Sequence, residues 1–358
     1  MPCLPKTTSA KPSPSVPLKV SPLVLILLAA CACLVWVLCP QPAPGEAVAF
    51  APSPFYDTCS VQPARSLVNT STLTLAGEPV PLHKRRVRAR LERELRHYLA
   101  APAQTRYMAA RARLYFKVID PILRRHGIPR DFRYVVAVES SFDNDAVSRR
   151  GATGLWQLMH SPAQEVGLQI NQEVDERLHL ERATEAAARY LKSLKKQTGS
   201  WTAALASYNC GPGRFARRAA LAGQRDYYRL WQRGETGRYV FKVLAVKELL
   251  ERPESYGLSL GRQRLGWPDC KRVRVSQPIA SLADFAQRHH TDLATLRELN
   301  PWLVGRSLTP PAGKAYHLLV NRKPYRRIAQ ADFARQDSAS RALTTARLDS
   351  VAFVAELL

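Results

Sequence analysis

The chain has 358 residues, enough for one medium-sized domain with smaller additions. Apolar residues make up 46% of it, which excludes a globally disordered protein. The formal net charge of +24 favours a polyanionic partner such as nucleic acid, anionic lipid or an acidic cell wall, and composition alone does not choose among them.

The N-terminus contains an uncharged apolar run at residues 20–39, and lysines precede it. A run of about 20 apolar residues can span a bilayer as a helix, and the lysines place residues 1–19 in the cytoplasm. We therefore expect a transmembrane signal anchor at 20–39, with the rest of the chain on the periplasmic side of an inner membrane. A cleaved signal peptide, which would release the protein into the periplasm, and a lipoprotein attached at Cys31 are the alternatives. Export makes nucleic acid an unexpected partner.

Residues 40–80 are expected to form a linker, because their first part is rich in Pro, Ala and Ser. From residue 81 to residue 254 apolar residues recur at helical spacing, which predicts one all-helical domain. A clear example is the segment 184–196, where we expect Ala187 and Leu191 to face inward and Gly199 to end the helix.

The pattern changes after residue 253. Residues 271–322 contain a strand-like segment at 273–275, two short apolar-striped segments, and a second strand-like segment at 317–320. This predicts a small β-α-α-β unit, followed by a tail at 323–358. The expected fold class is therefore mainly α, with an N-terminal anchor and a small α+β unit at the C-terminal side.

One carboxylate stands out within the helix predicted at 129–140. Phe132, Val135, Val136 and Glu139 follow the spacing i, i+3, i+4 and i+7, so Glu139 lies on the apolar face. Burial there would raise the pKa of this carboxyl and let it donate a proton near neutral pH. Periodicity alone leaves the plainer alternative of a frayed helix end turned to water.

Further motifs follow Glu139-Ser140-Ser141-Phe142 in the sequence. They are Gly-Ala-Thr-Gly-Leu-Trp-Gln-Leu-Met from Gly151, Ala-Ser-Tyr-Asn-Cys-Gly-Pro-Gly-Arg from Ala206, and Glu-Thr-Gly-Arg-Tyr-Val from Glu235. In this order and spacing the motifs resemble the lysozyme-like lytic transglycosylases of glycoside hydrolase family 23, nearest to the membrane-bound lytic murein transglycosylase D group. The resemblance covers about residues 110–250 and implies a lysozyme-like catalytic domain.

The resemblance also implies roles for individual residues. Glu139 matches the family's single catalytic acid/base. The positions that match substrate-binding residues of the family are Ser148, Gln157, Met159, Tyr208, Asn209, Glu235 and Tyr239. Plain structural roles are the alternatives: a turn for the Gly-rich segment, a capped helix end for the Tyr-Asn pair, and an ion pair with a neighbouring arginine for Glu235. Trp156 is expected in the core.

The activity implied is cleavage of the MurNAc-GlcNAc β-1,4 bond of peptidoglycan with formation of 1,6-anhydromuramyl ends. One carboxylate suffices for this reaction, and we interpret Asp143 and Asp145 as turn residues. The family implies no metal and no organic cofactor. A muramidase-type hydrolase and an inactive peptidoglycan-binding scaffold are the competing functions.

The sequence departs from the family pattern at Cys210, Asp145 and Phe241, none of which replaces a reacting group. The unit at 271–322 resembles a degenerate LysM module, a type that binds N-acetylglucosamine polymers. Pro278-Ile279-Ala280 replaces the usual Gly-Asp-Thr opening, so glycan binding and a purely structural role both stay open.

Overall fold

The computed structural model describes residue 68 and residues 72–258 and 267–322. Contacts divide the chain into Met1–Ala64 and Arg65–Leu358, and the described residues all belong to the second unit. The anchor expected at 20–39, the alternative lipid site at Cys31 and the tail at 323–358 lie outside the described residues. Within the described ranges, no helix has the length and apolar character needed to cross a membrane.

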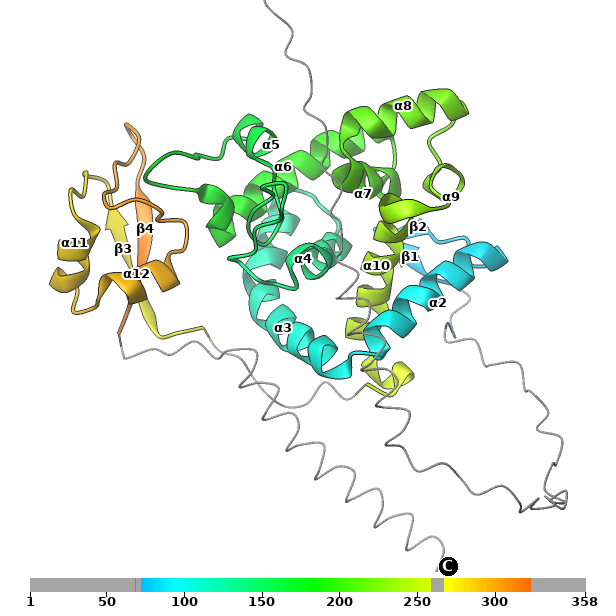
Figure 1. Ribbon diagram of the computed structural model, residues 1–358, viewed down its shortest axis with the longest axis horizontal. Coiled ribbons are helices and arrows are strands. Elements are labelled where there is room, and N and C mark those ends of the chain that lie inside the picture. The colour runs from blue at the N-terminus through cyan, green and yellow to red at the C-terminus, as the bar shows by residue number, and fades with distance from the viewer. Residues whose placement is uncertain (1–67, 69–71, 259–266, 323–358) are drawn as a thin grey trace, which may run out of the picture. The chain divides into compact units, whose positions relative to one another are not determined.

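Residues 85–251 are mainly helical, as the sequence predicted (Figure 1). The α-helices are α2 (Arg85–Leu99), α3 (Pro102–Arg125), α4 (Arg133–Ser140), α5 (His160–Glu165), α6 (Leu180–Thr198), α7 (Trp201–Cys210), α8 (Pro212–Ala222), α9 (Tyr227–Leu230) and α10 (Gly234–Glu251). Short 3-10 turns lie at Arg130–Phe132, Glu176–Leu178 and Pro253–Tyr256. The long helix α10 packs against α2, α4 and α7 and so joins the two ends of this part of the chain.

The helix predicted at 184–196 is α6. Its inward residues Ala187 and Leu191 are fully buried. Gly199 ends the helix in the left-handed region at φ 87°, where a residue without a Cβ is favoured. The helices α5 and α9 were not predicted, because six and four residues are too few to show a clear period. Helix α8 was not predicted either, and only Phe215 and Ala219 of its 11 residues are buried.

Residues 72–80, which we expected to belong to the linker, are instead folded onto the helical core. Strand β1 (Thr74–Leu75) pairs with β2 (Glu78–Pro79) in a small hairpin, and Leu75 is 1% exposed. The Glu78 carboxylate accepts hydrogen bonds from the backbone N–H groups of Trp201 and Thr202, at the start of α7. These bonds satisfy donors that a helix N-terminus leaves free, so the hairpin stabilises α7.

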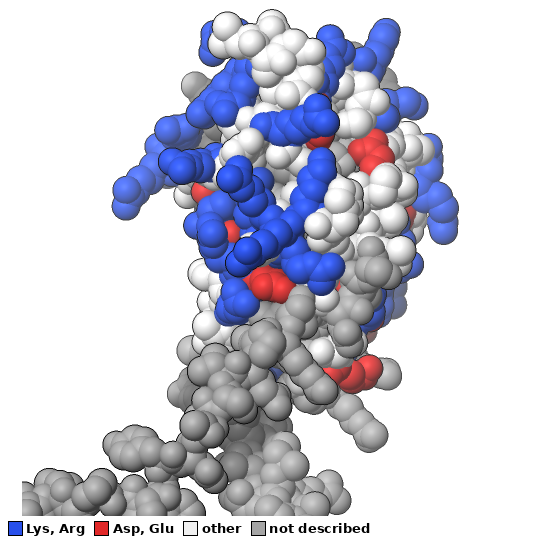
Figure 2. All heavy atoms as spheres, turned by 90° about the vertical axis from the view of Figure 1, so that its right-hand side faces the viewer, with Lys and Arg blue, Asp and Glu red and all other residues white. Residues whose placement is uncertain are grey.

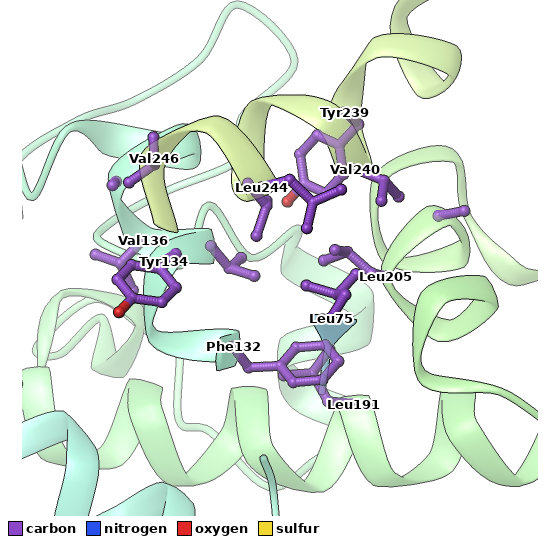
Figure 3. Close-up of a cluster of buried hydrophobic side chains, with 14 of the residues drawn as sticks. Leu75, Phe132, Tyr134, Val136, Leu191, Leu205, Tyr239, Val240, Leu244 and Val246 are labelled. Carbon is purple, nitrogen blue, oxygen red and sulfur yellow. The ribbon is translucent and has the colours of Figure 1, made fainter. Parts of the chain in front are cut away.

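Helix α4 lies at the centre of the core. Figure 3 shows Tyr134 and Val136 of α4 below Val246 of α10, with Leu244 farther along the same helix, and all four side chains are fully buried. The helix is therefore buried on several sides, which corrects the expectation of a single apolar stripe. A helix that core residues surround is apolar on more than one side, so its sequence shows no single apolar stripe.

The C-terminal unit has the predicted β-α-α-β order. Its elements are β3 (Cys270–Val275), α11 (Leu282–Arg288), α12 (Leu293–Leu299) and β4 (Tyr316–Asn321). The strands pair antiparallel, with Cys270 opposite Asn321 and Val275 opposite Tyr316, and the unit has its own small apolar core. Glu173, from the segment before α6, accepts hydrogen bonds from Ser307 and Thr309, so this segment holds the unit to the helical part.

Candidate active site

Glu139 is the penultimate residue of the buried helix α4. The helix ends at Ser141 in the left-handed region, with φ 51°. The Ser140 hydroxyl donates a hydrogen bond to the Leu155 carbonyl at 3.0 Å, which ties the helix end to the Gly-rich loop. Glu139 itself is half-buried, so it is not a frayed end turned fully to water.

The Glu139 carboxyl is set up to hold a proton near neutral pH. Burial raises its pKa to about 7, while the hydrogen bond that the Tyr239 hydroxyl donates to Oε1 and the positive charge of Lys242 act in the opposite direction. The negative charge of Glu235 adds to the rise. A carboxyl with such a pKa can give a proton to one group and, once ionised, take a proton from another.

Tyr208 lies close to this carboxyl. Its hydroxyl donates to the Trp156 carbonyl at 2.6 Å, and burial and the charge of Glu139 both raise its pKa. The ring of Trp156 is fully buried and its Nε1 donates to the Thr184 hydroxyl, which confirms that this tryptophan belongs to the core. Tyr208 therefore links the end of α7 to the Gly-rich loop beside Glu139.

Asn209 is oriented by a residue that sequence analysis did not single out. The Thr236 hydroxyl donates to Asn209 Oδ1 at 2.8 Å, and Thr236 is buried at the start of α10. This bond fixes which end of the Asn209 amide carries the oxygen and therefore which end carries the NH₂ donor. The sequence did point to Thr236, because this residue lies within the Glu-Thr-Gly-Arg-Tyr motif. The motif does not indicate, however, which residue Thr236 contacts.

Glu235 is exposed on the first turn of α10 and forms an ion pair with Lys242 at 2.7 Å. The ion pair expected for Glu235 is present, but its partner is a lysine and not an arginine. Lys242 was also missed, although Glu235, Tyr239 and Lys242 follow the spacing i, i+4 and i+7, which places them on one side of a helix.

The remaining predicted residues lie on the loop between α4 and α5. The Ser148 hydroxyl accepts the Ala152 N–H, and the Gln157 amide donates to the Ala146 and Gly154 carbonyls at 2.9 Å. Both side chains thus shape the loop itself. Met159 is 43% exposed at its end. The residues that the structure brings together around the carboxyl are Glu139, Tyr208, Glu235 and Tyr239, with Asn209 joined through Thr236.

In the described ranges, no three His, Cys, Asp or Glu side chains are grouped as metal ligands would be. Cys210, which follows the Tyr-Asn pair, is a half-buried free thiol, and burial raises its pKa. A raised pKa lowers the thiolate fraction and so the reactivity of this cysteine.

The chain matches two known protein-family models. Residues 119–230 match the transglycosylase SLT domain, and residues 271–324 match the soluble lytic transglycosylase C-terminal LysM-like domain. The chain contains an SLT lytic transglycosylase domain followed by a LysM-like domain.

The chain is distantly similar to two curated proteins. The chain is 28% identical over 228 residues to the membrane-bound lytic murein transglycosylase D of Escherichia coli, covering 61% of this chain and 49% of that protein. It is 33% identical over 110 residues to a putative tributyltin chloride resistance protein of an Alteromonas species, covering 30% and 53%. The chain thus spans about half the length of these curated relatives.

Two solved structures are also similar. One is the lytic transglycosylase Slt of Pseudomonas aeruginosa, with 26% identity, a TM-score of 0.33 and coverage of 39% of this chain and 24% of that one. The other is the 70 kDa soluble lytic transglycosylase of Escherichia coli, with 23% identity, a TM-score of 0.33 and coverage of 41% and 27%.

Proposed function

We propose that the SLT domain is a peptidoglycan lytic transglycosylase that cleaves the MurNAc-GlcNAc β-1,4 bond and leaves 1,6-anhydromuramyl ends during cell-wall remodelling. The observation that carries the proposal is the Glu139 carboxyl, whose pKa is raised to about 7 and which accepts a hydrogen bond from Tyr239. A group of this kind can serve as the single acid/base of the reaction.

In the first step, protonated Glu139 donates its proton to the glycosidic oxygen. The bond from this oxygen to C1 of the muramyl ring breaks as the 2-acetamido oxygen of the same sugar forms a bond to C1, and the acetamido group carries the positive charge that develops. The substrate thus supplies the group that a second carboxylate provides in most glycosidases.

In the second step, ionised Glu139 takes the proton of the muramyl 6-hydroxyl as O6 attacks C1. The bond between C1 and the acetamido oxygen breaks, and the 1,6-anhydro ring closes. Glu139 is protonated again, so the proton balance is complete and no water is consumed.

The neighbouring residues have supporting roles in this proposal. Tyr239 holds the carboxyl in place, and Tyr208 and Asn209 contact the sugars on either side of the cleaved bond. Glu235 closes the site, and the exposed part of the Gly-rich loop lines the glycan cleft through Ser148, Gln157 and Met159.

The surroundings of other carboxylates favour a transglycosylase over a muramidase-type hydrolase. Glu235 is exposed and engaged by Lys242. Asp143 Oδ1 accepts the Asp145 N–H at 3.4 Å, which is typical of a turn. Neither is in an environment that prepares it to activate a water molecule as a second catalytic carboxylate.

The same proposal extends to partners and location. We assign the catalytic unit to residues 81–254, preceded by the hairpin, and glycan binding to the LysM-like unit at 271–322. An anchor at 20–39 would hold both units on the periplasmic face of the inner membrane, where peptidoglycan is the substrate.

Release of soluble fragments from purified peptidoglycan tests whether the chain is an enzyme at all. We expect the full chain to release muropeptides at a rate proportional to its concentration. A scaffold would bind the insoluble material and release nothing, and that result would rule out the catalytic proposal.

Tyr239→Phe is expected to shift the pH dependence of this activity. The hydrogen bond from Tyr239 stabilises ionised Glu139, so the loss of this bond should raise the pKa of Glu139. At alkaline pH, kcat/KM falls because Glu139 loses its proton, and this fall should therefore move to higher pH in the variant. At the pH optimum, kcat/KM should be about 10- to 100-fold lower, because the carboxyl is no longer held in position. A pH-rate profile of both proteins measures the shift, and a limb that moves to lower pH would contradict the assignment.

A further inference from the structure

A strongly cationic face covers the part of the molecule formed by α2, α8, α9 and the first turn of α10. Figure 2 shows Lys and Arg side chains over most of this face, with few Asp and Glu among them. Seven Lys and Arg and two Glu lie within 84–97, and six Arg and one Asp lie within 212–233. Such an excess creates a positive potential that the proposed catalytic chemistry does not use.

Trp231 joins the segments of this face. Its carbonyl accepts a hydrogen bond from Arg90 of α2 at 2.7 Å, and the guanidinium groups of Arg214 and Arg218 of α8 lie 5.5 and 4.5 Å from its ring centroid. The two cationic segments, although far apart in sequence, therefore form one continuous surface.

Several arginines on this surface are exposed to solvent. Arg85, Arg86, Arg93, Arg217 and Arg233 are exposed, and within the described part of the chain none of them has an ion pair or a side-chain hydrogen bond. Their charges face solvent and are available to a partner.

A small pocket opens in the same surface between α2 and the start of α10. Its volume is about 150 Å³, and its lining includes Arg90, Arg93, Arg233 and Arg238. The acidic residue there, Glu94, is already paired with Arg238 at 2.8 Å. The pocket therefore keeps a net positive charge and suits a phosphate group.

Leu221 indicates what kind of anion the face meets. It is 91% exposed at the last turn of α8, between exposed Ala220 and Ala222 and in sequence between Arg218 and Arg225. A soluble polyanion would satisfy the arginines and leave this leucine in water. An anionic bilayer satisfies both, because cations remain among the headgroups while an apolar side chain enters the interface.

We propose that this face docks on an anionic phospholipid surface, with Leu221 inserted at the interface and a headgroup phosphate in the pocket between α2 and α10. The docking face uses Gly237 and Arg238 of α10, whereas Tyr239 on another side of the same helix holds Glu139. The contact is distinct from a membrane span at 20–39 and does not depend on the catalytic proposal.

Vesicle binding by the full chain tests this docking. The readout is the ratio of affinities for phosphatidylcholine vesicles with and without phosphatidylglycerol, because any contribution of the apolar run at 20–39 cancels in the ratio. Each basic residue at such a surface is worth about a five-fold change in affinity, so Arg93→Gln/Arg217→Gln should lower the ratio about 30-fold. Leu221→Ser should lower binding to the anionic vesicles about tenfold.

Lys192→Gln/Lys196→Gln on α6 is the matched control, because it removes the same charge from exposed lysines outside this face. It should change the ratio of affinities by no more than about two- to three-fold, which is the effect of the lower net charge alone. An equal loss in this control would overturn the proposal. So would a Leu221→Ser variant that binds anionic vesicles normally, which would indicate a soluble polyanion such as polyphosphate. Inorganic phosphate that abolishes vesicle binding, when chloride at equal ionic strength does not, would indicate a free-phosphate site instead. Unchanged melting temperatures and unchanged muropeptide release would exclude misfolding as the cause of any loss.

Discussion

Glu139→Gln is expected to reduce muropeptide release at least about 1,000-fold. General acid or base assistance contributes about 10²- to 10⁴-fold in enzymes, and here one carboxyl supplies both functions in succession. The amide keeps the size of the side chain and can still accept a hydrogen bond from Tyr239, but it cannot give up a proton to a leaving oxygen. Initial rates of fragment release from purified peptidoglycan measure the loss.

The fold of the Glu139→Gln variant provides the control. Because burial raises the pKa of Glu139 from 4.5 to about 7, the folded state holds a proton that the unfolded state loses. The native protein therefore loses stability as the pH rises through about 7, and the glutamine variant does not. We expect the variant to melt no lower than the native chain at pH 8. A variant that folds and still releases fragments at the native rate would contradict the role of Glu139.

Gly154→Ala is expected to lower the free energy of unfolding by about 2–5 kcal/mol. Gly154 has φ +78°, and an added Cβ would lie 2.2 Å from the Arg177 carbonyl oxygen. Arg177 cannot easily move, because it is buried and paired with Asp175 at 2.7 Å. The left-handed backbone costs an alanine about 1–2 kcal/mol, and the steric overlap adds about 1–3 kcal/mol. Urea denaturation measures the change.

Gly199→Ala is the matched control for this substitution. Gly199 also has a left-handed backbone, at φ +87°, but nothing lies within 4 Å of an added Cβ. The control should therefore lose only about 1–2 kcal/mol, the cost of the backbone conformation alone. Equal losses in the two variants would show that the close approach of Arg177 to the Gly-rich loop is not what requires glycine there.

The helices were predictable where an amphipathic period runs for several turns. Segment 184–196 predicted α6 and its end at Gly199, and the C-terminal unit showed its strands and short helices in the right order. The hairpin at 74–79 was not predictable, because it has too few residues to show a period. Its place is fixed by the capping of α7 through Glu78, a contact between segments more than 120 residues apart.

The candidate site was predictable only as a set of residues. Motif order singled out Glu139 and Tyr239, but their hydrogen bond joins positions 100 residues apart and follows from the packing of α4 against α10. Thr236 was missed because its role depends on which side of α10 meets Asn209, whereas the pairing of Lys242 with Glu235 lies within α10 and follows the helical spacing. Sequence patterns identify the elements that meet, and the individual contacts require the fold.

Digestion of peptidoglycan in water labelled with heavy oxygen tests the central claim most directly. If Glu139 directs transfer to the muramyl 6-hydroxyl, mass spectrometry should find 1,6-anhydromuramyl ends that are one water molecule lighter than reducing ends and contain no label. Reducing muramyl ends that contain heavy oxygen would show that water attacks C1, and would contradict a transglycosylase.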